Sequence, residues 1–344
     1  MDKLLTFAVA GAGKTTRLVS SLEDGKRSLI LTYTTANIEN LRRKVIDRYG
    51  FVPETVTISP YFSFIFSFCL RPFLSDKLSI EGINYKHVEQ NFSTKTSVEH
   101  YMDGSNRIRS ARIVKAIEVF GYERALVDRI NKYYDCVYVD EVQDLASRDF
   151  DFLRILAQTR AHVELIGDFF QHTYDSSRDQ NYRNNLFSDL TNYKRLLWDF
   201  GYSAHPVQLT HSYRCSKSLS EYITNTLGIK IDSHSERVTE VTYVEDEASG
   251  VELFRDPNIV KLFYKEHSQF GCFSRNWGEC KGEDGYLDVC LVLNKSSEAL
   301  YKKGRLHQSA PLTKNKLYVA MTRARGNLYL VSEDLVKKAK WTAT

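Results

Sequence analysis

The amino-acid sequence predicts an α/β protein with doubly wound parallel sheets, and three observations lead to this prediction. Short apolar runs rich in β-branched or aromatic residues recur along the chain. They are nearly continuous rather than alternating, which is typical of strands buried on both faces. Helix-like stretches separate them, as in strand–helix–strand units. The length of 344 residues corresponds to about two domains, each large enough to bury a core.

The elements follow in order along the chain. The expected strands are residues 4–9, 28–33, 136–139, 163–166, 289–293 and 328–331, and the expected helices are 16–22, 36–49, 150–158 and 217–227. Two stretches do not fit this pattern. The polar, Lys- and Arg-containing stretch at about 75–124 predicts a small, partly helical insertion. The acidic, polar stretch 232–250 predicts a loop or a hairpin.

Composition excludes several classes of protein. With 42% hydrophobic and 26% charged residues, the chain is neither collagen-like, disordered nor a disulfide miniprotein. The net charge of +4 is compatible with nucleic-acid binding but does not argue for it. The six cysteines form no C-x-x-C pair and have no zinc-ligand spacing, so we expect a reducing, cytoplasmic compartment and no structural metal.

No membrane association is expected. The longest uncharged stretch, residues 55–70, is interrupted by Ser, Thr and Pro60 and is shorter than a bilayer span. The first five residues are too short a lead for a signal peptide, because a motif begins directly after them.

Residues 8–16 read Ala-Val-Ala-Gly-Ala-Gly-Lys-Thr-Thr and lie between an expected strand and an expected helix, which is the context of a phosphate-binding loop. Small residues let backbone N–H groups approach phosphates, and the helix N-terminus adds a positive dipole end. Lys14 is expected to reach the β- and γ-phosphates, and the Thr15 hydroxyl to bind Mg²⁺. The remaining nucleotide-binding candidates are Ala10, Gly11, Ala12, Gly13 and Thr16. The alternative is a chance Gly-Lys-Thr in a strand–helix turn, since Ala8 replaces the first glycine of the usual pattern.

Two carboxylates, Asp140 and Glu141, follow the apolar run 137–139. In a nucleotide hydrolase, the first carboxylate at such a strand end holds Mg²⁺ and the second orients and deprotonates the attacking water. A solvated acidic turn is the alternative interpretation. It becomes the minor one once the Lys14 loop is considered together with the strand end.

These two motifs and six further segments resemble, in the same order, the motifs of superfamily 1 helicases of the UvrD/Rep type. The segments are 10–16 (motif I), 32–36 (Ia), 59–64 (Ib), 140–144 (II), 167–174 (III), 209–214 (IV), 278–282 (V) and 317–325 (VI). Motif VI, Leu-Tyr-Val-Ala-Met-Thr-Arg-Ala-Arg, is a close match. The resemblance implies two RecA-like domains, 1–205 with motifs I to III and 206–344 with motifs IV to VI, and the insertion lies in the first.

The resemblance also implies roles for individual residues. ATP with Mg²⁺ would be bound in a cleft between the two domains. Arg214 and Arg323 would act as arginine fingers, Gln171 would sense the γ-phosphate, and Tyr213 would stack on adenine. The simpler alternatives are surface arginines and a core tyrosine.

Single-stranded DNA would be bound by Thr34, Phe62, Ser63 and Tyr174 according to the same resemblance. Bases would stack on aromatic rings, and phosphates would meet amides and hydroxyls. Most of the other rings in the run 55–70 are expected to be core residues, because they follow one another at one- or two-residue spacing.

The chain departs from the family pattern in several places. Motif I begins too early for the glutamine that reads adenine, so adenine specificity is in question. Motif Ib lacks the usual histidine. The ribose-binding glutamate of motif V is missing, and Glu283 and Asp284 are the candidates to replace it. Only 67 positions separate Arg214 from Lys281, which predicts a compact form without the large second accessory domain.

Two functional hypotheses remain open at this stage. The first is an ATP-dependent translocase or helicase that moves 3′→5′ on single-stranded DNA or tailed duplex. The second is a nucleotide-gated regulatory or sensor subunit of a nuclease-containing anti-phage complex, with little unwinding of its own. An inactive homologue is disfavoured because the residues expected to bind and hydrolyse ATP are all present: Lys14, Thr15, Asp140, Glu141, Gln171, Arg214 and Arg323.

Overall fold

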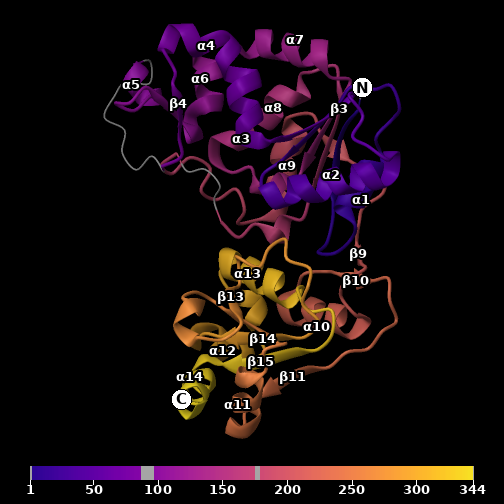
Figure 1. The fold of residues 1–344 in the computed structure, drawn as a ribbon, viewed down its shortest axis with the longest axis vertical. Helices are drawn as coiled ribbons and strands as arrows, with labels where there is room; N and C mark the ends of the chain where they lie inside the picture. The colour runs from indigo at the N-terminus through magenta and orange to yellow at the C-terminus, as the bar shows by residue number, and fades with distance from the viewer. Residues whose placement is uncertain (1, 87–96, 175–178, 344) are drawn as a thin grey trace. The chain divides into compact units, whose positions relative to one another are not determined.

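The computed structural model describes residues 2–86, 97–174 and 179–343, and the chain divides into two α/β units (Figure 1). The first unit comprises Met1–Thr6, Lys14–Gly167 and Asp175–Gln208. The second comprises Phe7–Gly13, Asp168–Tyr174 and Leu209–Thr344. The segments 7–13 and 168–174 therefore pack with the second unit, although the strands that lead into them belong to the sheet of the first.

The first unit is built on a six-stranded sheet in the order β3-β2-β6-β7-β1-β8. Its strands are β1 (Lys3–Phe7), β2 (Ser28–Thr32), β3 (Val56–Pro60), β6 (Cys136–Asp140), β7 (His162–Gly167) and β8 (Ser203–Ala204). Strand β2 pairs in parallel with β3 and β6, β6 pairs with β7, and β1 pairs with β8. Every residue of β2 and β6 is buried, as expected for apolar strands covered on both faces.

The helices of the first unit follow in chain order. They are α1 (Lys14–Ser20), α2 (Thr35–Tyr49), α3 (Tyr61–Phe64), α4 (Arg71–Leu78), α5 (Val98–Tyr101), α6 (Ile113–Val119), α7 (Glu123–Tyr133), α8 (Phe152–Ala157) and α9 (Leu190–Asp199). Leu18 of α1 and Leu41 of α2 belong to one buried cluster with Ile30 of β2 and Tyr138 of β6. The sequence periodicity therefore places the apolar faces of α1 and α2 on the sheet.

The segment between β3 and β6 contains the expected insertion. It holds a π-helix at Ile65–Leu70, then α4, a short parallel pair of β4 (Gly82–Asn84) and β5 (Arg107–Arg109), α5, α6 and α7. Part of the sequence assigned to the insertion, 87–96, lies outside the described residues.

A buried charge network ties this segment to the chain that follows motif III. Arg112 is 2% exposed, and its Nε and Nη2 atoms donate to Asp179 Oδ1 at 3.0 and 2.9 Å. Arg148 Nε donates to Asp179 Oδ2 at 2.8 Å. Because Asp179 is 5% exposed, its charge depends on these two arginines for compensation.

The second unit has a five-stranded sheet in the order β11-β15-β14-β12-β13, and all its pairs are parallel. The strands are β11 (Val241–Val244), β12 (Val260–Phe263), β13 (Ser274–Asn276), β14 (Val289–Leu293) and β15 (Leu328–Ser332). A separate pair joins β9 (His211–Ser212) to β10 (Asp232–Ser233). The helices are α10 (Lys217–Leu227), α11 (Glu247–Arg255), α12 (Lys295–Lys302), α13 (Pro311–Met321) and α14 (Glu333–Ala343).

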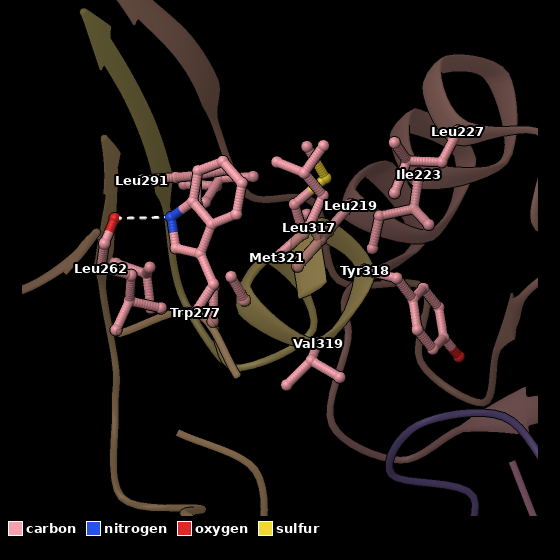
Figure 2. Close-up of a cluster of buried hydrophobic side chains, with 14 of the residues drawn as sticks. Leu219, Ile223, Leu227, Leu262, Trp277, Leu291, Leu317, Tyr318, Val319 and Met321 are labelled. Atoms are coloured by element: carbon pink, nitrogen blue, oxygen red, sulfur yellow. Dashed lines mark hydrogen bonds between the residues drawn. The ribbon is translucent and has the colours of Figure 1, made fainter. Parts of the chain in front are cut away.

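Trp277 lies in the core of the second unit (Figure 2). It is fully buried, and its indole Nε1 donates to the carbonyl oxygen of Leu262 in β12 at 2.8 Å. Side chains of α10 and α13, among them Leu219 and Leu317, belong to the same cluster. The indole therefore fixes β12 to the segment after β13 while it fills the space between sheet and helices.

Both units have the doubly wound α/β architecture that the sequence predicts. The prediction for 232–250 was wrong, because this stretch is not a hairpin: β10 pairs with β9, β11 pairs in parallel with β15, and α11 begins at Glu247. Strand β12 was missed because Lys261 interrupts its apolar pattern. That lysine is nevertheless 1% exposed, and its ammonium group donates to the carbonyl oxygen of Asp256.

No helix in the described part of the chain is both long and apolar enough to cross a bilayer. All six cysteines are free thiols, and all are buried except the half-buried Cys272.

The buried Asp179 network gives a stability prediction. We expect Asp179→Ala to lower the free energy of unfolding of the first unit by about 3 kcal/mol or more, because Arg112 would keep its burial and lose its carboxylate. Hydrogen exchange of amides in β2 and β6 would measure this loss. Lys115→Ala, which removes the more exposed ion pair with Glu118, is the control and should change little. Equal effects of the two substitutions would contradict the prediction.

Candidate nucleotide-binding site

The predicted nucleotide-binding residues form two groups, one in each unit, and each group has its own geometry. Lys14, Thr15, Thr16, Asp140 and Glu141 belong to the first unit. The second unit holds Ala10, Gly11, Ala12, Gly13, Gln171, Tyr213, Arg214 and Arg323.

In the first unit, Lys14 lies against the acidic strand end. It is the first residue of α1 and is 9% exposed, and its Nζ lies 3.5 Å from Glu141 Oε1. The Gln143 side-chain amide donates to the other carboxylate oxygen of Glu141. Glu141 itself has φ +54°, a left-handed conformation that residues other than glycine rarely adopt and that is typical of functional turns.

Asp140 ends β6 and is 4% exposed. Burial, and then the neighbouring Glu141 carboxylate, raise the pKa of Asp140 to about 7, while Lys14 opposes the shift. Two carboxylates therefore share one ammonium group, and this excess of buried negative charge fits a divalent cation with oxygen ligands. Asp140 and the half-buried Thr15 are the residues that could hold Mg²⁺.

Thr16 is exposed, and its hydroxyl accepts a hydrogen bond from Lys44.

The neighbouring strand supports this acidic turn through a glycine. A Cβ at Gly167, the last residue of β7, would lie 2.3 Å from Gln143 Oε1 and 2.8 Å from Val142 Cγ1. No side chain fits at this position, so β7 can pack directly against the turn that carries Glu141. Sequence reasoning placed Gly167 in motif III but did not assign it this role.

In the second unit, the loop residues pack against motifs IV and VI. The backbone N–H of Ala10 donates to Tyr318 Oη at 2.9 Å, and the carbonyl of Gly11 accepts from Tyr213 N at 2.9 Å. Gly11 has φ +71°, and a Cβ there would lie 2.7 Å from Arg214 Cβ. Glycine is therefore required both by the backbone conformation and by the close approach. Ala12 is buried as well, and Gly13 has φ +79°.

The two predicted arginine fingers converge on one carboxylate. Arg214 Nη2 pairs with Asp284, and Arg323 Nη1 lies 4.0 Å from Asp284 Oδ1. Arg323 is 2% exposed and also donates to the carbonyl oxygen of Glu283 at 2.9 Å, so it is not a surface arginine. Burial, and then Arg323, lower the pKa of Arg214 to about 10, so Arg214 remains charged at neutral pH.

Tyr213 is 69% exposed and is therefore not a core residue. Its ring stacks on His234, with 3.9 Å between the ring centroids and an interplanar angle of 13°. A cavity of about 180 Å³ lies beside it, lined by Gly11, Tyr213, Arg214, Arg237, Asp284 and Arg325. Sequence reasoning identified neither Arg237 nor Arg325, although Arg325 lies within motif VI.

Gln171 belongs to a buried network that joins three motifs. Its Nε2 donates to Asp168 Oδ2 at 3.0 Å, and Tyr318 Oη donates to the same oxygen at 3.0 Å. The hydroxyl of Tyr318 thus accepts from the phosphate loop at Ala10 and donates to motif III at Asp168. Tyr318 is fully buried, and burial together with Asp168 raises its pKa, so it stays protonated and able to donate.

The residues predicted to bind DNA are more dispersed. Thr34 caps α2 by accepting from Asn37 N at 3.2 Å. The half-buried Phe62 meets Tyr33 and Tyr85 edge-on, with centroids 5.4 and 5.3 Å apart. Ser63 is exposed, and Tyr174, in the second unit, is 44% exposed. The structure thus brings Phe62 together with Tyr85, which sequence reasoning did not select.

Fold and loop together define the class: a two-unit α/β protein with a phosphate-loop motif and an acidic strand end. A sequence profile described as the UvrD/REP helicase N-terminal domain matches residues 79–184, which is less than a third of the chain. DNA helicase II of Haemophilus influenzae is 23% identical over 185 residues, which cover 54% of this chain and 23% of that protein.

Among solved structures, a complex of arterivirus nonstructural protein 10 (helicase) with DNA superposes with a TM-score of 0.51 at 14% identity. It covers 98% of this chain and 63% of that one, which shows a shared fold of two RecA-like units. The profile match and the alignment with DNA helicase II agree with the resemblance to superfamily 1 helicases of the UvrD/Rep type. The chain spans about a quarter of the length of the curated relative that it matches. The absence of a large second accessory domain therefore stays a prediction.

The close packing at Gly167 gives a second prediction. We expect Gly167→Ala to lower the free energy of unfolding of the first unit by about 1–3 kcal/mol, because the new methyl group would force Val142 and Gln143 to move. Hydrogen exchange of amides in β6 and β7 would measure the loss. Gly104→Ala is the matched control, since a Cβ there meets nothing within 4 Å. A Gly167→Ala protein as stable as this control would refute the packing constraint.

Proposed function

We propose that the chain is an ATP-dependent translocase or helicase that acts on single-stranded DNA. The observation that carries the proposal is the Lys14–Glu141 contact of 3.5 Å beside the buried Asp140. An ammonium group at a phosphate loop, next to a cation-binding carboxylate and a second carboxylate, is the arrangement that hydrolysis of a nucleoside triphosphate requires.

Each residue of this group has a distinct role in the proposed hydrolysis. Lys14 and the loop amides bind the β- and γ-phosphates. Mg²⁺, held by Thr15 and Asp140, would neutralise charge on the phosphate oxygens. Glu141 accepts a proton from the water that attacks the γ-phosphorus, while the bond to the β-phosphate oxygen breaks. When ATP takes over Lys14, the Glu141 carboxylate loses its ammonium partner and is released to act as base.

Arg214 and Arg323 supply the remaining positive charge. Both carry fixed guanidinium groups, and negative charge develops on the γ-phosphoryl oxygens in the transition state. The proposal requires the arginines of the second unit and Lys14 of the first to act on one nucleotide. Gln171, bound to Asp168, would then report the loss of the γ-phosphate to the rest of the second unit.

The DNA part of the proposal rests on the relatives and on exposed aromatic rings. The arterivirus helicase was solved with DNA. Phe62, with Tyr85 beside it, offers a surface on which bases can stack. The 3′→5′ direction follows only from the resemblance to UvrD/Rep helicases. A nuclease partner remains a prediction, and no contact in the described residues favours it.

Steady-state ATP hydrolysis, with and without single-stranded DNA, tests the proposal. We expect stimulation by DNA and displacement of a strand from a 3′-tailed duplex, but not from a 5′-tailed one. Stimulated hydrolysis without displacement would favour the regulatory alternative. Absence of any hydrolysis with Mg²⁺ and DNA would refute the proposal.

Glu141→Gln tests the general base. We expect the rate constant of hydrolysis to fall about 10²- to 10⁴-fold, while ATP binding persists, because the amide keeps the shape of the carboxylate but cannot accept the proton. Fluorescence anisotropy of a labelled ATP analogue would measure binding. Glu23→Gln, an exposed glutamate of the same unit, is the control. Unchanged turnover in Glu141→Gln would exclude its role as base.

Phe62→Ala tests the aromatic surface. We expect the Kd for a fluorescent oligothymidylate to rise about 5- to 150-fold, since one stacked base contributes about 1–3 kcal/mol. Nucleotide binding without DNA should stay the same. Phe51→Ala removes a 64% exposed ring elsewhere in the first unit and is the control. Equal Kd values for the two variants would remove Phe62 from the DNA site.

A further inference from the structure

The cavity in the second unit carries more positive charge than the helicase motifs explain. Three arginines line it, Arg214, Arg237 and Arg325, against the single carboxylate of Asp284. The motif resemblance assigned a role only to Arg214. Because like charges gathered around one cavity repel each other, such an arrangement favours the binding of an anion.

The backbone fixes the positions of Arg237 and Arg325. Arg237 Nη2 donates to the carbonyl oxygen of Arg214 at 2.9 Å, which holds its guanidinium beside motif IV. Arg325 follows α13, and its N–H donates to the carbonyl oxygen of Leu287 at 3.0 Å. Neither side chain forms an ion pair with any residue in the described part of the chain.

Asp284 is the acidic member of the cavity. It pairs with Arg214 and lies 4.0 Å from Arg323 Nη1, yet its own side chain is 57% exposed. An ion pair with such an exposed partner is worth little, because water screens it. A competing anion with more charge and more oxygen atoms can therefore replace this carboxylate.

The nature of the anion follows from the wall of the cavity. Gly11 of the phosphate loop lines it together with the three arginines, and Tyr213 presents an exposed ring at the same place. A site that holds phosphate groups beside a stacked base fits a nucleotide. The aromatic rings around Phe62, on which DNA bases could stack, belong to the first unit instead.

We propose that Arg237 and Arg325 are further phosphate-binding residues of the nucleotide site, and that Asp284 is the counter-ion which the nucleotide phosphates displace from Arg214. The inference rests on the proposed ATPase function and deepens it. Substitution of either arginine and substitution of Asp284 consequently have opposite effects on the affinity for nucleotide. Loss of Arg237 or Arg325 weakens nucleotide binding, and loss of the Asp284 charge strengthens it.

Anisotropy titration of the full chain with a labelled ATP analogue and Mg²⁺, without DNA, tests this inference. We expect Arg237→Ala and Arg325→Ala each to raise the Kd about 10-fold, and Asp284→Asn to lower it about 3-fold. Arg305→Ala and Glu252→Gln, exposed residues of the same unit, are the matched controls. Circular dichroism of every variant verifies folding, and Arg237→Gln and Arg325→Gln repeat the measurement with longer side chains.

Each other outcome overturns the inference in a distinct way. If wild-type protein binds and hydrolyses ATP while the arginine variants match their control, the proposed function survives and this inference fails. If Asp284→Asn weakens binding, Asp284 contacts the ribose instead. If the arginine variants lose affinity for an oligothymidylate but keep it for ATP, the cavity binds DNA phosphates. If wild-type protein binds no nucleotide, both proposals fail together.

Discussion

Buried negative charge at the carboxyl end of β6 is the constraint on which the candidate site depends. Asp140 is buried and Glu141 follows it in a left-handed conformation, so two carboxylates meet where a parallel strand leaves the sheet. The ammonium group of Lys14, at the start of α1, supplies one compensating positive charge. The glycine that ends β7 allows the neighbouring strand to approach this turn. Charge, backbone conformation and packing thus all favour the binding of a cation and a phosphate chain at one place.

Much of the fold could be predicted from the sequence where burial alone decides structure. Strands β2, β6 and β14 are fully buried, and a strand covered on both faces leaves a continuous apolar run in the sequence. Strand β12 leaves no such run, because Lys261 buries its stem and satisfies its ammonium group on a nearby carbonyl. Strand β11 depends on pairing with β15, more than 80 positions away, and local composition carries no information about that partner.

The candidate site shows the same division. The phosphate loop around Lys14 and the two acids after an apolar strand could be predicted, because in each case the residues that act together are neighbours in the sequence. Tyr318 and Arg325 lie within a segment that the motif comparison selected, but their roles arise from contacts with distant residues. Arg237 lies outside every motif and becomes visible only because its guanidinium reaches the backbone of Arg214. A pattern of residues indicates which chemistry is present, and the fold decides which charges share a cavity.

The hydroxyl of Tyr318 has a consequence for how the chain can be divided. Its two hydrogen-bond partners lie at Ala10 and Asp168, in segments that come from the first half of the sequence and pack with the second unit. A fragment that starts at Leu209 would keep the buried ring and lose both partners. The two α/β units are therefore interleaved along the polypeptide, and a single cut before Leu209 separates the second unit from two segments that pack with it, 7–13 and 168–174.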